Sequence, residues 1–150
     1  MRMRCKLEII NTQRLCAINK KKIKNLVQGI LKIEGKDAEI NIVFTDNKKI
    51  KEINKTFLRH NYATDVISFP YHESSTSNAI NGEIIISAEK ATEVSQKHGY
   101  EAEGEIALYV IHGLLHLLGY DDKQKKEAKK MHQRERELLL HFGYNVPVPV

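Results

Sequence analysis

The amino-acid sequence predicts an α+β fold in a single domain. Its 150 residues are enough to build one hydrophobic core. Segments with the alternation of strands are interspersed with segments of helical periodicity, which favours a sheet packed against helices. The composition, 41% apolar and 29% charged, is that of an ordinary globular protein. We find no internal repeat, so we expect residues 1–150 to form one unit.

The first half of the chain is expected to contain two strands and two helices. Alternating apolar residues predict strands over residues 6–11 and 38–44. Asn19 is a good residue to precede a helix, and Gly35 is a good residue to end one, so a helix is expected between them. A shorter helix is predicted over residues 48–57.

The middle of the chain alternates loops and strands. Residues 59–65 are polar and lack periodicity, so they are expected to form a loop. A short β-branched run over residues 66–69 predicts a strand that Pro70 stops. Residues 72–81, rich in Ser, Thr and Asn, are expected to form a mobile surface loop. Gly82 leads into a fourth strand over residues 83–87, and its continuous apolar run predicts burial on both faces.

Three helices are expected to complete the fold. The first covers residues 88–97. The second, residues 101–118, begins with acidic residues and becomes increasingly apolar, which predicts a central buried helix. A third, highly charged helix is expected over residues 123–142. The two prolines of residues 145–150 cannot continue it, so this tail is expected to be loosely held.

A histidine pair at the end of the buried helix predicts a metal site. His112 and His116 are four residues apart and therefore lie one turn apart on the same helix face. Gly119 can adopt the left-handed conformation that reverses the chain, and Asp122 lies six residues after His116. Three protein ligands with an open fourth position are typical of a catalytic zinc site. A pair of structural, hydrogen-bonded core histidines is the alternative.

The residue after the first histidine disfavours a peptidase. In zinc peptidases of the H-E-x-x-H type, a glutamate at this position is the general base. Here the position holds Gly113. The base must then be metal hydroxide or a group from elsewhere, which is acceptable for a phosphodiester substrate.

Charge and cysteine content limit the partners and the compartment. The formal charge of +5 favours polyanionic partners, although a merely solvated basic surface is an equal explanation. Cys5 and Cys16 are too few for a disulfide framework, which favours a reducing compartment. Neither a signal peptide nor an apolar run of membrane-spanning length is present. We therefore expect a cytoplasmic protein without membrane association.

Three motifs together resemble those of the YbeY family of bacterial single-strand-specific endoribonucleases, also described as rRNA maturation factors. The helix motif reads H-G-L-L-H-L-L-G-Y-D. The loop and strand over residues 58–70 contain R-H-N-Y-A-T-D-V-I-S-F-P, and the next strand contains N-G-E-I-I-I-S. With Met131 and Glu135 at matching distances, the resemblance covers most of the region from Ile53 to Phe142.

The resemblance implies a zincin-like α+β fold with a four-stranded mixed sheet flanked by helices. It also implies a zinc ion held by three side chains at the end of a positively charged groove. His112 and His116 match the first two family ligands, and Arg59 matches an arginine implicated in activity that faces the metal. The third ligand of the family is usually histidine, and here that position is Asp122.

This departure changes the expected metal chemistry. An aspartate oxygen can replace the imidazole nitrogen, but it makes the site less positive, so manganese would compete better with zinc. We expect one divalent metal ion, with zinc as the first candidate. Two alternatives remain: Asp122 does not coordinate and tight metal binding is lost, or Asp121 replaces it, although only Asp122 lies at the matching offset.

The function expected from the resemblance is hydrolysis of RNA phosphodiesters in rRNA maturation, including processing of the 3′ end of small-subunit rRNA, and in ribosome quality control. Arg59 would stabilise negative charge on the phosphate, unless it is an ordinary surface or capping arginine. Glu135 would orient a ligand histidine, or else form a helix salt bridge. Single-stranded RNA would be led along the groove by four lysines: Lys48, Lys49, Lys51 and Lys55.

Other polar residues in these motifs are assigned structural positions. Thr64 and Asp65 are expected to cap and shape their loop. His60, His132 and His141 are expected at the surface, since no motif includes them in the site.

Two rival functions come from other classes. The chain would be a ribosome-assembly factor with a structural metal, or a metal-dependent hydrolase of a substrate other than RNA. The partners expected are single-stranded RNA or an rRNA precursor, together with small-subunit ribosomal proteins and a ribosome-assembly GTPase.

Overall fold

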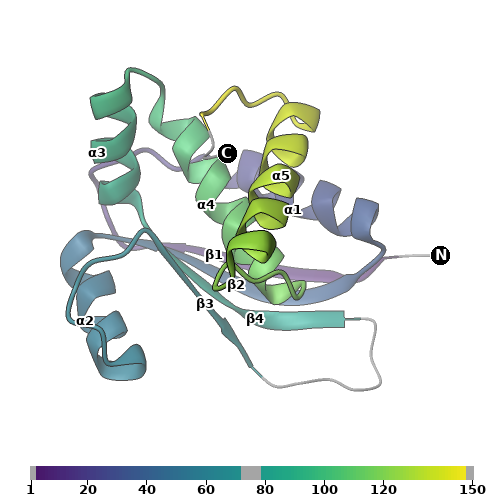
Figure 1. Cartoon of the computed structure of the whole chain (residues 1–150), viewed down its shortest axis with the longest axis horizontal. Coiled ribbons are helices and arrows are strands. Elements are labelled where there is room, and N and C mark those ends of the chain that lie inside the picture. The colour runs from purple at the N-terminus through teal and green to yellow at the C-terminus, as the bar shows by residue number, and fades with distance from the viewer. Residues whose placement is uncertain (1–2, 72–78, 148–150) are drawn as a thin grey trace.

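The computed structural model describes residues 3–71 and 79–147. These residues form five helices and one four-stranded sheet (Figure 1). Among them, no helix combines the length and the apolar character needed to cross a lipid bilayer.

The sheet is mixed and its strands are in the order β1-β2-β4-β3. Strand β1 (Cys5–Asn11) pairs in parallel with β2 (Asp37–Thr45), which pairs in parallel with β4 (Ala79–Ser87). Strand β3 (Val66–Pro70) is antiparallel to β4 and lies at the edge. The predicted α+β class with a four-stranded mixed sheet is confirmed.

Strand β4 begins earlier than the sequence predicts. The expected loop over residues 72–81 ends at residue 78, because Ala79 already pairs with Asp37 of β2. Polar composition misled the prediction here, since pairing with a neighbouring strand overrides local propensity. Residues 72–78 lie outside the described residues, so the expectation of a mobile loop applies to a part that is not described.

The helix boundaries lie within two residues of those expected. The five helices are α1 (Lys20–Glu34), α2 (Asn47–Leu58), α3 (Ala88–His98), α4 (Ala102–Leu117) and α5 (Lys125–His141). The Asn19 side chain accepts a hydrogen bond from the Lys22 N–H, and Gly35 ends α1 with a φ of 66°. Both predicted caps of this helix are therefore present.

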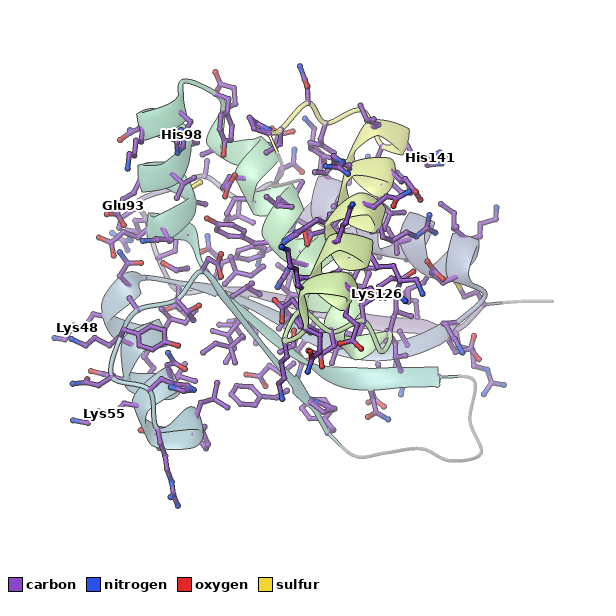
Figure 2. All side chains as sticks on the ribbon, in the orientation of Figure 1. Lys48, Lys55, Glu93, His98, Lys126 and His141 are labelled. Atoms are coloured by element: carbon purple, nitrogen blue, oxygen red, sulfur yellow. The ribbon has the colours of Figure 1, made fainter. Side chains whose placement is uncertain are left out.

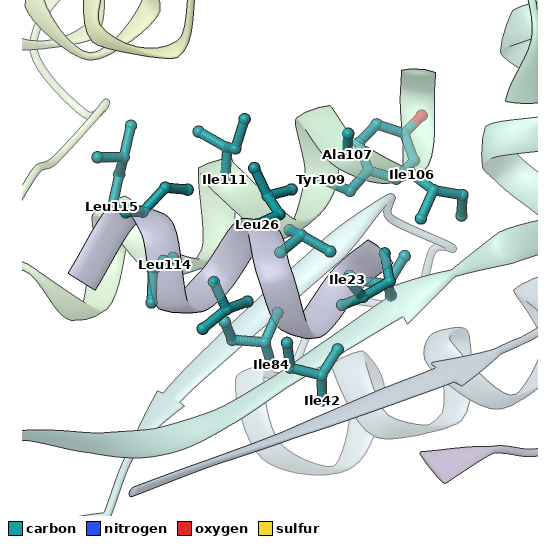
Figure 3. Close-up of a cluster of buried hydrophobic side chains, with 14 of the residues drawn as sticks. Ile23, Leu26, Ile42, Ile84, Ile106, Ala107, Tyr109, Ile111, Leu114 and Leu115 are labelled. Atoms are coloured by element: carbon teal, nitrogen blue, oxygen red, sulfur yellow. The ribbon is translucent and has the colours of Figure 1, made fainter. Parts of the chain in front are cut away.

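Helices cover both faces of the sheet, and the two faces differ in size. Helices α1 and α4 pack on one face, where Ile42, Ile84 and Leu114 belong to the main core, and α5 packs on α4 (Figures 1 and 3). Helix α2 packs on the other face, where Ile50 meets Ile85 in a smaller cluster. Because side chains alternate along β4, this strand is buried on both faces, as predicted.

Helix α4 is the buried centre of the larger layer. It contacts β3, β4 and three other helices, α1, α3 and α5. Burial of its large apolar side chains supplies about 1.5–3 kcal/mol each, so its position is strongly fixed. Val146 of the tail packs against the core, and it lies so close to Gly104 of α4 that an added Cβ there would come within 2.5 Å of it. The sequence prediction missed this contact because it depends on a glycine far away in the chain.

Candidate metal centre

The end of α4 and the turn after it bring three potential ligands together. His112 and His116 lie on the last turns of the helix, and Gly119, with a φ of 105°, lies in the turn before Asp122. One ligand atom from each of His112, His116 and Asp122 lies within 4.8 Å of the others, so the group could hold a metal ion. The Nε2 atoms of His112 and His116 are 3.1 Å apart. Asp122 Oδ2 lies 3.5 Å from the Nε2 atom of His112 and 3.7 Å from the Nε2 atom of His116.

The other nitrogen of each imidazole determines which atoms face the centre of the group. His112 Nδ1 lies 2.9 Å from Glu135 Oε1, and His116 Nδ1 lies 3.1 Å from the Tyr120 carbonyl oxygen. A carbonyl oxygen and an ionised carboxylate only accept hydrogen bonds, so both Nδ1 atoms must donate. In a neutral ring with its proton on Nδ1, the Nε2 atom carries no hydrogen. Both Nε2 atoms can then offer a lone pair to a metal ion.

Two nitrogen lone pairs and a carboxylate oxygen therefore converge on one point. Without a cation between them, these three groups repel each other. Two Zn–N bonds of about 2.0–2.1 Å at a tetrahedral angle separate the nitrogens by about 3.3 Å, close to the distance found. The donor set thus fits a divalent ion, with a shared proton as the competing occupant.

The local backbone explains why Tyr120 and Asp122 point back at the helix. The Tyr120 N–H donates to the Leu115 carbonyl at 2.9 Å, which folds the turn over the helix end. Asp121 Oδ1 accepts from the backbone N–H groups of Asp122 and Lys123 at 2.8 and 3.3 Å. Asp121 is thus occupied in shaping the turn, whereas Asp122 faces the two histidines.

Glu135 of α5 supports the group from behind. Its side chain is only 2% exposed, so a partner is needed for its charge. Burial lowers the pKa of His112, but the hydrogen bond to Glu135 and the charges of Glu135, Asp65 and Asp122 outweigh burial and raise it above the usual value. A proton on His112 therefore competes with a metal ion more strongly than on an ordinary histidine.

Gly113 leaves no room for the glutamate of a peptidase. A Cβ at this position would lie 2.6 Å from Ile84 Cγ2 and 3.2 Å from Ser68 Oγ. The Ser68 hydroxyl also donates to the Gly113 carbonyl at 2.9 Å, which holds the helix against β3. The missing peptidase base is thus a consequence of the close packing of α4 on the sheet.

A cavity of about 490 Å³ adjoins the histidines. His112 and Glu135 line it, and so do Asp65, Glu105 and His132, which sequence reasoning did not assign to the site. His132 is not the surface residue expected: its side chain is 26% exposed, and its buried Nδ1 lies 3.5 Å from Glu135 Oε1. The signal that was overlooked is its spacing of three residues from Glu135, which places both on one face of α5.

Asp65 has the structural role expected and a second one. It caps the start of β3, where its carboxylate accepts from the Val66 N–H at 2.7 Å and its carbonyl accepts from Ser87. It also contributes negative charge to the cavity.

Two tyrosines beside Glu105 keep their hydroxyl protons. Burial, followed by the hydrogen bond to Glu105, raises the pKa of Tyr100. Burial, followed by the charge of Glu105, raises the pKa of Tyr109.

Arg59 and the four lysines lie on α2 and not on the helix of the histidines. Arg59 is exposed and ends α2 with a φ of 59°, the only positive φ of a non-glycine residue among those described. Left-handed backbone is unfavourable for such a residue and is often found at functional positions. Lys48 and Lys55 project outward from α2 (Figure 2), and Lys49 and Lys51 are also exposed. His60 and His141 are exposed, as expected.

The fold and the site together define a class of protein: an α+β domain whose central helix and following turn present a His-His-Asp group that could hold a metal ion. The family model described as endoribonuclease YbeY matches residues 8–143. The chain belongs to this family. The match begins well before Ile53, the start of the region in which the sequence shows the resemblance.

Individual relatives agree with this assignment. The chain is 38% identical over 160 residues to endoribonuclease YbeY of Clostridium botulinum (strain 657 / Type Ba4), covering 90% of this chain and 96% of the relative. It is 36% identical to that of Syntrophus aciditrophicus, with 95% and 94% covered. The solution structure of a Thermotoga maritima protein is similar, with a TM-score of 0.64, 27% identity and coverage of 91% of this chain and 88% of that one.

Proposed function

We propose that this chain is a metal-dependent endoribonuclease that cleaves single-stranded RNA in rRNA maturation, including the 3′ end of small-subunit rRNA, and in ribosome quality control. One observation carries the metal-dependent part: two imidazole lone pairs and a carboxylate converge at 3.1–3.7 Å. Membership of a family described as endoribonucleases supports RNA as the substrate.

His112, His116 and Asp122 would hold one divalent ion, and zinc is the first candidate for this mixture of nitrogen and oxygen ligands. The ion would supply Lewis-acid chemistry, polarising a phosphoryl oxygen and making water more acidic. The carboxylate makes the site less positive than three histidines would, which favours competition from manganese.

The roles of the chain's own residues follow from their contacts. Glu135 keeps the Nδ1 proton of His112 in place, and the Tyr120 carbonyl does the same for His116, so both Nε2 atoms stay available as ligands. Arg59 would bind phosphate oxygens with its planar fork of N–H donors and stabilise the charge that develops there. The lysines of α2 would attract the RNA backbone.

Three further assignments belong to the same proposal. The histidine pair on a central helix that packs against a mixed sheet supports a zincin-like description of the fold. A role in rRNA processing supports a cytoplasmic location. Partners besides RNA would be small-subunit ribosomal proteins and a ribosome-assembly GTPase.

The test is a cleavage assay with metal-quantified protein on end-labelled RNA, single-stranded and annealed to its complement. We expect cleavage of the single strand and protection of the duplex. Arg59→Ala should lose about 100-fold or more in rate, because it removes a donor aimed at developing charge. Arg14→Ala removes another exposed arginine, from a different part of the chain, and should keep the wild-type rate.

Two results would contradict the proposal. If folded Arg59→Ala and His116→Ala variants cleave at the wild-type rate, the activity belongs to a contaminant. If wild-type protein with one bound metal binds single-stranded RNA without cleaving it, the assembly-factor function replaces the enzyme.

A further inference from the structure

Three exposed rings flank Arg59 in the sequence at the end of α2. The side chain of Phe57 is 68% exposed and that of Tyr62 is 55% exposed, and His60 between them is also exposed. We call Phe57, His60 and Tyr62 the aromatic segment. Large rings are usually buried because their burial is strongly favourable, so several exposed rings within six residues indicate a binding surface.

Contacts hold the aromatic segment in one arrangement. The Phe57 ring meets Phe69 of β3 edge to face at 5.9 Å between centroids, and the His60 and Tyr62 rings lie 5.4 Å apart. The buried Asn54 fixes the backbone below them. Its carbonyl accepts from the N–H groups of Arg59 and His60, and its side chain donates to the Tyr62 carbonyl at 3.0 Å. The rings are therefore exposed without being loosely held.

The charge around these rings selects the kind of ligand. Between residues 46 and 62 there are five basic side chains and two carboxylates, a formal excess of +3. Arg59 lies within the aromatic segment, and Lys55 precedes it by one helix turn. A basic surface interleaved with exposed rings is the pattern that binds single-stranded nucleic acid, since the cations follow the phosphates and the rings stack on the bases. An apolar protein partner would not require the excess of cations.

The chain links this surface to the candidate metal centre. Asp65, which lines the cavity beside His112, follows Arg59 by six residues. Six residues span at most about 20 Å, so a strand bound at the aromatic segment has the cavity within reach of a few nucleotides.

We propose that Phe57, His60 and Tyr62 form a base-stacking platform that positions single-stranded RNA for the metal centre, an inference that rests on the proposed function. The platform accounts for a preference for single strands, because paired bases have no free face for the rings. It tolerates any sequence, since every base has a stacking face.

The test measures RNA affinity separately from cleavage. Fluorescence anisotropy with a labelled single-stranded RNA, in the presence of a chelator to prevent cleavage, gives the Kd of each variant. We expect Tyr62→Ala and Phe57→Ala each to weaken binding by about tenfold. Phe57→Leu keeps an apolar contact with Phe69 but removes the ring, so it should show the same loss even if the alanine variant is unstable. Leu140→Ala, at an apolar side chain of α5 that is 72% exposed, should bind like wild type.

A second RNA without bases at three central positions distinguishes stacking from general attraction. Wild type should bind this RNA about as weakly as the ring variants bind intact RNA, and the ring variants should lose little more on it. If Phe57→Leu and Tyr62→Ala bind intact RNA with the wild-type Kd, the platform is wrong. It is equally wrong if these variants bind both RNAs more weakly than wild type by the same factor, because their loss would then not depend on the bases. It is also wrong if wild type does not bind intact RNA.

The outcome can be separated from that of the proposed function. If metal-loaded wild type does not cleave RNA but the ring variants lose affinity as expected, the platform stands and the enzyme proposal fails. If wild type cleaves and the ring variants bind and cleave equally well, the enzyme proposal stands and the platform fails.

Discussion

The end of α4 and the end of α2 are built in opposite ways. His112 is largely buried, packed on the sheet through the adjacent Gly113 and bound to the buried Glu135 of α5. Arg59 is exposed, and what fixes it is backbone: a left-handed φ and the N–H bond to Asn54. One region is held by its side-chain contacts and the other by its main chain.

The two regions suit different ligands. A half-buried, tautomer-fixed pair of imidazoles is preorganised to bind one small cation in one geometry. An exposed arginine among exposed rings can meet a long, flexible polyanion at several points. The predictions below test whether the two regions are as different as their contacts imply.

Loss of a histidine ligand should have the largest effect. His116→Ala removes one of three converging ligand atoms, so we expect divalent metal affinity to fall by at least about 100-fold, beyond what loss of a supporting contact costs. Competition with a chromophoric chelator measures this. His141→Ala, at the exposed end of α5, is the matched control and should leave affinity unchanged. Equal affinity of His116→Ala and wild type would remove His116 from the site.

Loss of the supporting carboxylate should have a smaller effect. Glu135→Gln keeps the shape and an acceptor for His112 but removes the buried charge, so metal affinity should fall by about 10–100-fold. The same titration measures it. Glu137→Gln changes an exposed carboxylate of the same helix that binds Arg134, and it should have no effect on metal binding. If both variants bind alike, Glu135 serves folding only.

At the end of α2, the left-handed backbone of Arg59 predicts a difference in stability between two variants. Glycine adopts a positive φ freely, so Arg59→Gly should be more stable than Arg59→Ala by about 1 kcal/mol, although both lose the guanidinium. Denaturant unfolding of the two variants measures the difference. At the exposed Lys129 within α5, the order should reverse, with alanine about 1 kcal/mol more stable than glycine. The same order at both positions would contradict a fixed left-handed Arg59.

The smallest expected effect is a pH dependence of the metal-free protein. The folded state raises the pKa of His112, so this residue contributes stability that is fully present below its unfolded pKa of about 6.5. That contribution is lost as pH rises through the higher folded pKa. The Tm of chelated protein should therefore fall over this window, and His112→Gln should show a shallower fall. An unchanged slope in His112→Gln would mean that another group is responsible.

The sequence predicted the buried region better than the exposed one. Helical periodicity and spacing placed His112, His116 and Asp122 correctly relative to one another, because a helix and a glycine turn have regular geometry. The predictions of a loop at residues 79–81 and of a surface position for His132 were wrong. Strand pairing and the packing between α4 and α5 depend on residues distant in the chain. The exposed Phe57 and Tyr62 follow no periodic pattern in the sequence. The sequence alone therefore does not distinguish them from aromatic residues that are exposed by chance.

Metal-dependent RNA cleavage by the group of His112, His116 and Asp122 is tested most simply by measuring cleavage at a defined ratio of metal to protein. This chain would be stripped with a chelator, assayed on labelled single-stranded RNA, and assayed again after zinc or manganese is returned up to one equivalent. We expect loss of cleavage, recovery that saturates at one ion per chain, and no recovery in His116→Ala. Undiminished cleavage by the stripped wild-type chain would contradict this expectation.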